Sequence, residues 1–234
     1  MDIYGSLLRA IEEEYDTINL LKESPRGSVS VIRHRSSGAR FLLRKYTGSC
    51  EVYQKLLPIT SPHLPQIMEA VQQGENAIVI EEYIQGDTLS SLLECSALTP
   101  AQTRKITKQL CSALWILHSM GAVHRDVKPE NVILRGADAV LIDFDAARIY
   151  KDEKDSDTRI LGTTGYAAPE QYGISQSDGR ADIYALGVLM NIMLTGKHPS
   201  IELAGGRLGK IIQRCTMVSP EKRYSSIIYL METL

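Results

Sequence analysis

The sequence predicts an α+β protein with a first part made mostly of antiparallel sheet and a second part made mostly of helix. Between residues 17 and 82, short β-type runs are separated by turn residues. After Gly86, apolar residues recur at helical spacing over longer segments. The turn at Gln85 and Gly86 is the natural hinge, so we expect two lobes, residues 1–84 and residues 85–234.

The first lobe is expected to begin with a helix, because Leu7, Leu8, Ile11 and Tyr15 recur at helical spacing with glutamates between them. The turns at residues 25–27 and 36–38 then divide the chain into a three-strand meander. The strands predicted in this lobe are residues 18–21, 28–33, 41–46, 67–71 and 77–82, with a short helix at residues 51–57.

The second lobe is expected to be helical around one short pair of strands. Thr99 is an N-cap candidate for the longest helix. The predicted helices are residues 89–93, 100–120 and 180–194, and the strands are residues 132–134 and 140–142. Little room remains for a helix between Thr195 and Leu208, so we expect a shortened lobe.

Composition narrows the class of protein. The 234 residues are 44% hydrophobic and carry a formal charge of −2, which provides no general attraction for nucleic acid or an anionic membrane. The four cysteines form no Cys-x-x-Cys pair, so we interpret them as reduced thiols in a cytoplasmic protein. The apolar stretches are too short to span a bilayer, and a membrane anchor beyond Leu234 stays an open alternative.

The strongest chemical signal is the segment 124–131, which reads His-Arg-Asp-Val-Lys-Pro-Glu-Asn, followed by Asp-Phe-Asp at residues 143–145. Phosphoryl transfer needs a carboxylate that orients the acceptor, a cation near the γ-phosphate and oxygen ligands for magnesium. These two loops contain that set. The sequence therefore indicates a phosphotransferase.

The order of these residues resembles the catalytic and magnesium-binding loops of protein kinases, and the resemblance covers roughly residues 15–230. Residues 162–170 read Gly-Thr-Thr-Gly-Tyr-Ala-Ala-Pro-Glu and resemble the end of the family's activation segment. The sequence of this segment is most similar to that of bacterial serine/threonine kinases of the eukaryotic (Hanks) type. The resemblance implies the bilobal protein-kinase-like fold and a protein substrate with a Ser or Thr acceptor.

The resemblance also implies roles for the transfer residues. Asp126 would orient the acceptor hydroxyl and take its proton, and Lys128 would balance charge on the γ-phosphate. Asn131 and Asp143 would hold Mg²⁺, with Mn²⁺ as an alternative. Thr163 would bond both Asp126 and Lys128.

The resemblance also implies residues that support the site and residues that are phosphorylated. Glu170 would be buried against Arg223, and Asp182 would bind the backbone of the catalytic loop. Arg125 would pair with a phosphorylated hydroxyl of the activation segment. The candidate acceptors are Ser156, Thr158, Thr163 and Thr164.

The expected nucleotide clamp departs from the family pattern. Residues 22–29 keep only the third glycine of the glycine loop, Gly27, followed by Val29. Glycines let a backbone pass close to phosphates. Two interpretations stay open: the side chains of Lys22 or Arg26 replace some backbone donors, or the loop sits off the nucleotide.

The lysine of the third strand is also displaced. Counting from Val29 puts Arg44 at this position, and Lys45 would point to the opposite face unless the register shifts. The expected partner of Arg44 is Glu51 in the short helix, although Glu51 could be a plain solvated charge.

Adenine is expected at the hinge, where it would meet the backbone of Glu82 and Ile84, with Ile133 lining the site. Either Glu81 or Ile80 would be the gatekeeper, and a buried Glu81 would need a partner such as Arg44. Asp145 replaces the glycine of Asp-Phe-Gly, which would be costly if that residue needs a positive φ.

The leading hypothesis is a Mg²⁺- and ATP-dependent serine/threonine protein kinase that phosphorylates its own segment. The alternative is a pseudokinase that acts as a nucleotide- or partner-binding scaffold, because the glycine loop and the strand-three lysine are altered. A small-molecule phosphotransferase fits less well, since such enzymes generally lack the Ala-Pro-Glu segment. No nucleic acid or membrane contact is expected from this chain, and the oligomeric state stays open.

Overall fold

The computed structural model describes residues 2–150, 163, 165–172 and 178–234. The chain divides into two units. The first consists of Met1–Ser61 and Pro65–Gln85, and the second of Pro62–Leu64 and Gly86–Leu234. The predicted α+β class is confirmed, because the first unit contains an antiparallel sheet and the second is mostly helical.

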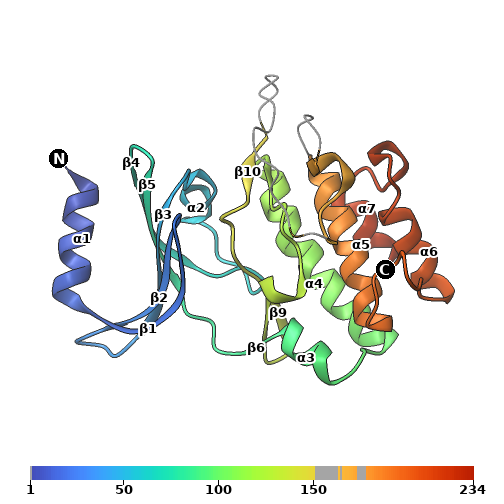
Figure 1. Cartoon of the computed structure of the whole chain (residues 1–234), viewed down its shortest axis with the longest axis horizontal. Helices are drawn as coiled ribbons and strands as arrows, with labels where there is room; N and C mark the ends of the chain where they lie inside the picture. The colour runs from blue at the N-terminus through green and yellow to red at the C-terminus, as the bar shows by residue number, and fades with distance from the viewer. Residues whose placement is uncertain (1, 151–162, 164, 173–177) are drawn as a thin grey trace. The chain divides into compact units, whose positions relative to one another are not determined.

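The first unit is a five-stranded antiparallel sheet with two helices (Figure 1). The strand order is β1-β2-β3-β5-β4, so the predicted meander of the first three strands is confirmed. The elements are α1 (Ile3–Glu14), β1 (Tyr15–Ser24), β2 (Gly27–His34), β3 (Arg40–Thr47), α2 (Glu51–Leu56), β4 (Ile67–Gln73) and β5 (Asn76–Glu82). β1 is longer than expected, with register shifts that accommodate two extra residues.

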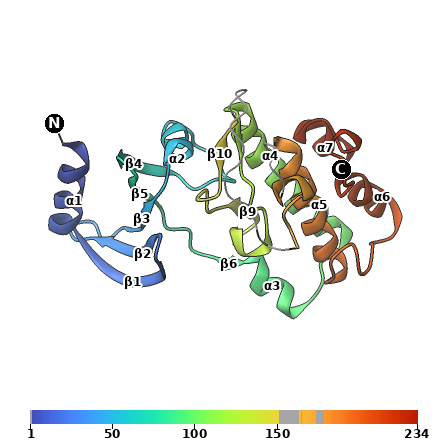
Figure 2. The same cartoon turned by 45° about the horizontal axis from the view of Figure 1, so that its top comes forward.

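Helix α1 covers one face of this sheet, as Figures 1 and 2 both show. Ile11 of the helix packs in one buried cluster with Ile32 of β2, Leu43 of β3, and Ile78 and Ile80 of β5. These residues alternate along their strands with residues of the other face, which is the period expected of a half-buried strand. We call the two sides the α1 face and the inner face.

Helix α2 lies on the inner face. The ring of Tyr53 in α2 is 6.3 Å from the ring of Tyr46 in β3, and Tyr46 alternates with the α1-face residue Lys45. α2 is only six residues long and has no side-chain N-cap. It is therefore fixed more by burial of Val52, Tyr53 and Leu56 than by its own capping.

The second unit is built around two long helices, α4 (Pro100–Ser119) and α5 (Gly179–Thr195). Thr99 and Gln102 form a capping box at the start of α4, so the predicted N-cap is confirmed. α5 is buried along most of its length, which fits a sequence that is apolar around most of the helix. The other helices are α3 (Leu89–Cys95), α6 (Gly206–Cys215) and α7 (Ile227–Thr233).

Short strands position the loops of the second unit. β8 (Val132–Arg135) and β9 (Asp138–Leu141) form the predicted hairpin, with β6 (Asp87–Thr88) on the other edge of β8. β7 (Ala122–Val123) pairs with β10 (Arg148–Ile149). The catalytic-loop sequence therefore leaves β7 and enters β8, while the Asp-Phe-Asp sequence follows β9.

The connection between α5 and α6 is short and contains no helix, as the sequence predicted. Asn191 of α5 is fully buried and holds this connection. Its Nδ2 donates to the carbonyls of Lys197 (2.8 Å) and Glu202 (2.7 Å), and its Oδ1 accepts from the N–H of Ala204 (2.9 Å). One side-chain amide thus replaces the regular hydrogen bonds that a helix would supply.

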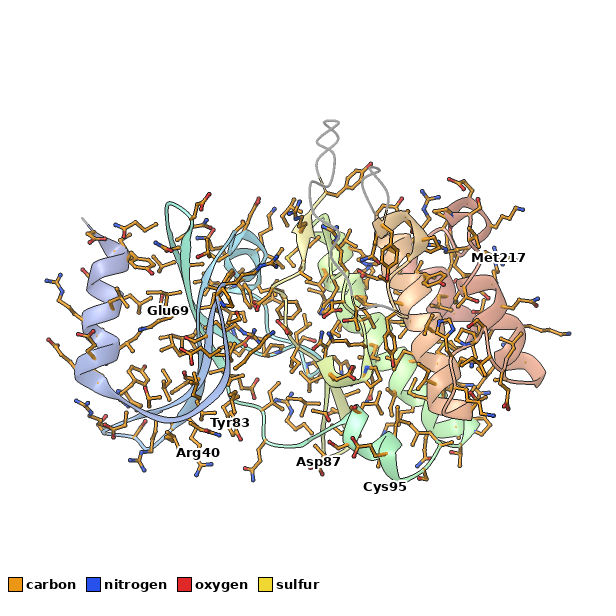
Figure 3. All side chains as sticks on the ribbon, in the orientation of Figure 1. Arg40, Glu69, Tyr83, Asp87, Cys95 and Met217 are labelled. Atoms are coloured by element: carbon orange, nitrogen blue, oxygen red, sulfur yellow. The ribbon has the colours of Figure 1, made fainter. Side chains whose placement is uncertain are left out.

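The four cysteines are free thiols, as predicted. Three are buried, and Cys95 is exposed at the edge of the second unit (Figure 3). Among the described residues, no helix is both long and apolar enough to cross a membrane.

Candidate active site

The carboxylate of Asp126 is the centre of a small polar cluster in the second unit. Lys128 Nζ lies 2.8 Å from Asp126 Oδ2, and Thr163 Oγ1 donates to Asp126 Oδ1 at 2.7 Å. Lys128 Nζ also donates to Thr163 Oγ1 at 2.7 Å. Asp126, Lys128 and Thr163 therefore form a closed triangle, as the sequence predicted for Thr163.

Asn131 fixes the other side of Asp126. Its Nδ2 donates to the Asp126 carbonyl (2.9 Å) and to Asp126 Oδ2 (3.0 Å). This leaves Asn131 Oδ1 without a hydrogen bond among the described residues, although the side chain is buried. The Asn131 carbonyl accepts from the N–H of Ile142 at 2.9 Å, which brings Asp143 next to it in the fold.

These oxygens suit a magnesium ion. Mg²⁺ prefers carboxylate, amide and water oxygens over nitrogen or sulfur. The amide of Asn131 is oriented with its nitrogen toward Asp126, which leaves its oxygen as a candidate ligand. Asp143 would supply the carboxylate, and it is held at φ +68°, a conformation that non-glycine residues seldom adopt.

The backbone of the catalytic loop is held by a buried acid from α5. Asp182 accepts from the N–H of His124 (2.9 Å) and from the N–H of Arg125 (2.8 Å), which confirms its expected structural role. Its Oδ2 also lies 2.8 Å from His118 Nε2. Burial alone would raise the pKa of Asp182, but the His118 contact and these hydrogen bonds hold the pKa below its ordinary value.

Arg125 has a left-handed backbone, with φ +70°. Gln171 Nε2 donates to the Arg125 carbonyl at 2.9 Å, so both peptide groups of Arg125 are held. A strained residue persists only where its surroundings determine it. The structure therefore locks the turn that presents Asp126.

The pKa of Asp126 is also shifted downward. Burial opposes this shift, but the hydrogen bonds from Lys128 and Thr163 outweigh it. The carboxylate is therefore ionised at neutral pH. An ionised carboxylate beside a lysine suits a group that orients a hydroxyl and takes its proton.

Arg223 is a buried arginine whose guanidinium binds several segments of the second unit. Its Nη1 and Nη2 donate to the two carboxylate oxygens of Glu170, at 2.6 and 2.8 Å, which confirms the predicted pair. The guanidinium also donates to the carbonyls of Met217, Arg180 and Val218. The buried guanidinium thus connects three chain segments, by a bidentate ion pair with Glu170 and by hydrogen bonds to backbone carbonyls.

In the first unit, the expected glycine loop is a tight hairpin. Ser24 pairs with Gly27, and only Pro25 and Arg26 lie between β1 and β2. Ser24 Oγ accepts from the N–H of Arg26 and donates to the carbonyl of Gly27. Gly27 has φ +148°, and a Cβ there would come within 2.0 Å of the Lys45 carbonyl, so this glycine is required by the close approach of β3.

Arg44 occupies the position expected of the strand-three lysine. It pairs with Val29 of β2 and Val79 of β5, so the register from Val29 is not shifted. Its Nε donates to Glu81 Oε1 at 2.6 Å. Both side chains are almost fully buried, with 5% and 1% exposed.

The register of β5 puts the two gatekeeper candidates, Glu81 and Ile80, on opposite faces of the sheet. Glu81 lies on the inner face with Arg44, whereas Ile80 belongs to the α1-face core. The partner expected for Arg44 was Glu51, and the ion pair that the structure describes is with Glu81. Within the described part of the chain, the carboxylate of the half-buried Glu51 makes no ion pair or hydrogen bond, so the structure does not pair it with Arg44.

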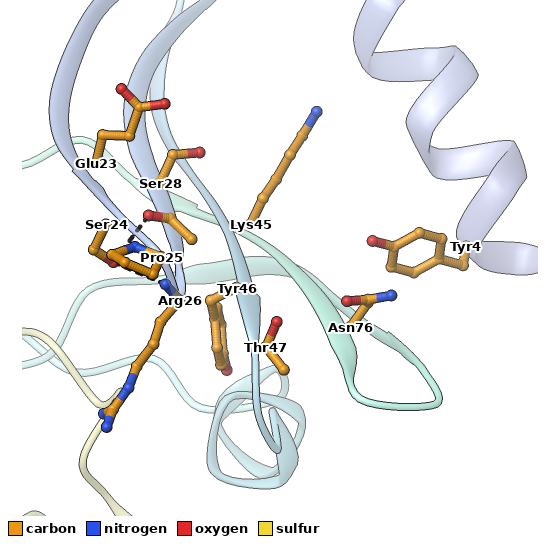
Figure 4. A pocket seen from close by; sticks show the side chains of 11 residues that line it. Tyr4, Glu23, Ser24, Pro25, Arg26, Ser28, Lys45, Tyr46, Thr47 and Asn76 are labelled. Carbon is orange, nitrogen blue, oxygen red and sulfur yellow. Dashed lines mark hydrogen bonds between the residues drawn. The ribbon is translucent and has the colours of Figure 1, made fainter.

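Lys45 points to the α1 face. Figure 4 shows its side chain directed away from the strand on the side of Tyr4 of α1. Lys45 and Tyr4, together with Ser28 and Asn76, are among the residues that line a hollow of about 330 Å³. Lys45 and Arg44 therefore serve opposite faces of one strand.

The hinge residues follow β5. The N–H of Glu82 donates to the Gln66 carbonyl at 2.8 Å, and its carboxylate accepts from the Gln66 N–H at 3.2 Å. The N–H and carbonyl of Ile84 make no hydrogen bond within the described part of the chain, although its side chain is buried. Ile133 lies in β8 of the second unit and is half-buried.

Comparison with known proteins decides the family. The protein kinase domain pattern matches residues 10–229. The chain belongs to the protein kinase family.

Among the relatives of this kinase domain is the serine/threonine-protein kinase pkn2 of Myxococcus xanthus, with 32% identity over 169 residues. PknD of Mycobacterium tuberculosis is 38% identical over 144 residues, and serine/threonine-protein kinase D of Synechocystis is 30% identical over 200 residues. The matches cover 67%, 60% and 73% of this chain. They cover only 20%, 22% and 38% of the relatives, so the chain spans a minor part of their length.

The family assignment confirms the resemblance to bacterial Hanks-type kinases and the bilobal kinase fold. One detail of the kinase domain differs from the sequence expectations. Asp145 does not have a positive φ, because within the described chain the positive-φ residues other than glycine are Arg125 and Asp143. The strain anticipated at Asp145 therefore lies at Asp143.

Other expectations on this kinase domain lie outside the described residues. Ser156, Thr158 and Thr164 are among them, so their role as phosphorylation sites stays a prediction. Sequence reasoning also missed two contacts that support the catalytic loop, from His118 and Gln171. His118 lies on the helix that precedes the loop and Gln171 follows Glu170 directly, so only their closeness to recognised motifs could have indicated them.

Proposed function

We propose that this chain is a serine/threonine protein kinase that transfers the γ-phosphate of ATP in the presence of Mg²⁺. The proposal rests above all on the closed triangle of Asp126, Lys128 and Thr163. Packing alone does not require an ionised carboxylate, an ammonium and a hydroxyl to converge in a partly buried place. The relatives named serine/threonine-protein kinases support the same activity.

In the proposed reaction, Asp126 orients the acceptor hydroxyl and takes its proton as the hydroxyl oxygen bonds to the γ-phosphorus. The bond from that phosphorus to the bridging oxygen breaks, and ADP leaves. Lys128 balances the charge of the transferred group. Asn131 and Asp143 would hold Mg²⁺, which supplies positive charge to the phosphate oxygens when bound.

In the first unit, the proposal assigns the phosphates to Arg44 and the hairpin at Gly27 and Val29. Adenine would meet the carbonyl of Glu82 and the N–H of Ile84, and Ile133 of the second unit is proposed as a further adenine contact. Among the residues that the structure describes, the N–H and carbonyl of Ile84 make no hydrogen bond, and this supports the assignment. Lys45 is assigned no phosphate contact, because it points to the α1 face.

The test is incubation with Mg²⁺ and ATP, followed by mass spectrometry of the protein and of a generic Ser/Thr acceptor. Wild type should gain phosphate on itself or on the acceptor, and Asp126→Asn should not. Absence of phosphate from both wild-type reactions would favour the scaffold function. Arg44→Met should weaken nucleotide binding and Lys45→Met should not; the reverse result would contradict the assignment of the two faces.

A further inference from the structure

The Arg44–Glu81 pair lies within a single pair of strands. Leu42 of β3 is opposite Glu81 of β5, and Arg44 is opposite Val79, so Arg44 and Glu81 occupy diagonal positions on the inner face. β3 and β5 are joined by a continuous antiparallel ladder. Both ends of the ion pair therefore belong to two directly paired strands of one sheet.

We propose that Glu81 is a positioning residue for nucleotide binding. Its carboxylate, which comes from β5 of the same sheet, holds the Arg44 guanidinium in place for the phosphates of ATP. This inference rests on the proposed function, in which Arg44 contacts ATP. It assigns to β5 the task that the sequence pattern assigned to Glu51.

The position of Glu51 supports this assignment. α2 lies on the same face as Arg44, because Tyr53 packs near Tyr46. An acid from α2 is therefore available on the correct side of the sheet. The buried carboxylate at 2.6 Å from Arg44 Nε nevertheless comes from β5.

The chemistry of arginine suits this arrangement. A guanidinium has five N–H donors in a planar fork, and Glu81 takes the one on Nε. One arginine can thus bind a carboxylate on one edge and a phosphate with its terminal nitrogens. A lysine ammonium is a compact point charge and does not divide its donors in this way. The pair therefore gives a physical reason for arginine at this position.

The experiment compares two matched changes, Glu81→Gln and Glu51→Gln, each of which removes one negative charge from the first unit. Binding of a fluorescent ATP analogue with Mg²⁺ and the steady-state kinetics for ATP are measured for both. We expect Glu81→Gln to raise Kd and KM for ATP about tenfold, the effect of losing one charge-assisted contact. The change in kcat should be smaller, and Glu51→Gln should have the weaker effect on Kd.

Three controls make the comparison decisive. Glu69→Gln, on the exposed surface of β4, should bind like wild type. Glu81→Asp keeps the charge and should restore part of the affinity, and it replaces Glu81→Gln if that variant does not fold. Urea denaturation of each variant shows that the protein measured is folded.

A Glu51→Gln variant that binds as weakly as Glu81→Gln, or a Glu81→Gln variant that binds like wild type, would overturn the inference. Failure of wild type to bind the nucleotide at all is a different result and would overturn the proposed function. Wild-type binding that Arg44→Met leaves unchanged would remove the role of Arg44, and with it the role of Glu81.

Discussion

Asp126 receives hydrogen bonds from three side chains: Lys128, Thr163 and Asn131. Each bond fixes one direction of the carboxylate, so its orientation is set before any substrate arrives. Such preorganisation is a large part of how enzymes stabilise charge during a reaction. Thr163 is notable among the three because it comes from a distant part of the sequence and bridges the other two groups.

Thr163→Val tests this bridge. Valine has nearly the same shape but no hydroxyl, so Asp126 loses one donor and Lys128 loses one acceptor. We expect kcat for phosphoryl transfer to fall about ten- to a hundredfold because the reacting groups are less well oriented. KM for ATP should change much less. Thr163→Ser keeps the hydroxyl and should retain most of the activity; equal losses in both variants would show that the methyl group, not the bond, matters.

At the scale of residues, the sequence predicted that Thr163 bonds both Asp126 and Lys128, and the structure describes both contacts. Asp126 and Lys128 belong to one short motif whose spacing fixes local geometry, and Thr163 belongs to a second recognisable motif; their catalytic roles stay predictions. The sequence indicated Arg44 only as one possible partner of Glu81. The two residues are 37 positions apart, and their contact depends on the register of two strands. Pairing across a sheet is set by turns and packing, which local spacing does not reveal.

Among the elements, the β1–β2 hairpin is constrained at one residue. Gly27 and Gly38 both have positive φ in this sheet, but only Gly27 is crowded by neighbouring backbone. Gly27→Ala should lower the free energy of unfolding by about 2–4 kcal/mol, since the backbone of β3 must move. Gly38→Ala should cost only about 1 kcal/mol, the conformational term alone.

Urea denaturation of the two alanine variants measures this difference. The two glycines differ in φ as well as in crowding, so the excess loss at Gly27 reports the steric contact with Lys45 and Tyr46 together with the less favourable φ of Gly27. Similar losses at the two positions would indicate that the hairpin adjusts freely.

The connection after α5 depends on a single buried amide. Asn191→Leu conserves the approximate volume but leaves the carbonyls of Lys197 and Glu202 and the N–H of Ala204 without their partner. We expect a loss of about 3 kcal/mol or more in the free energy of unfolding. Thermal and urea unfolding measure it, and Asn191→Ala separates the lost bonds from any steric effect of leucine. A leucine variant as stable as wild type would contradict this role.

Over the whole molecule, buried acids link stability to pH. The pKa of Asp182 is lower in the folded protein than its ordinary value of 3.8, so the unfolded chain binds protons more readily. The ionised Asp182 therefore stabilises the folded protein at pH values above the ordinary pKa of the group. This stabilisation is lost as the pH falls through the lower pKa that Asp182 has in the folded protein. Asp126 acts in the same direction.

We therefore expect the free energy of unfolding to decrease as pH is lowered from about 5 to 3. Asp182→Asn should be less stable at neutral pH, and its stability should depend less on pH in the acidic range. Urea titrations at several pH values measure both effects. An equal acid dependence in wild type and in Asp182→Asn would assign the acid sensitivity to other carboxylates.

The arrangement of elements was predictable over most of the chain because the periods are regular. The alternation in β2, β3 and β5 and the capping signal at Thr99 indicated the correct elements with nearly correct ends. β1 was underestimated, since its extra residues break the alternation. The anchors of the catalytic loop, His118 and Gln171, could not be predicted, because their contacts depend on how α4 and the segment after Glu170 pack in three dimensions.

The Arg44–Glu81 pair also predicts how these two positions vary among related chains. A mutation of either residue alone leaves a charge buried in the sheet, which is costly, so the two positions should change together during evolution. Chains related to this one that carry lysine at position 44 should more often carry an uncharged residue at position 81. An alignment broad enough to contain both forms would show whether these two residues are inherited as a unit.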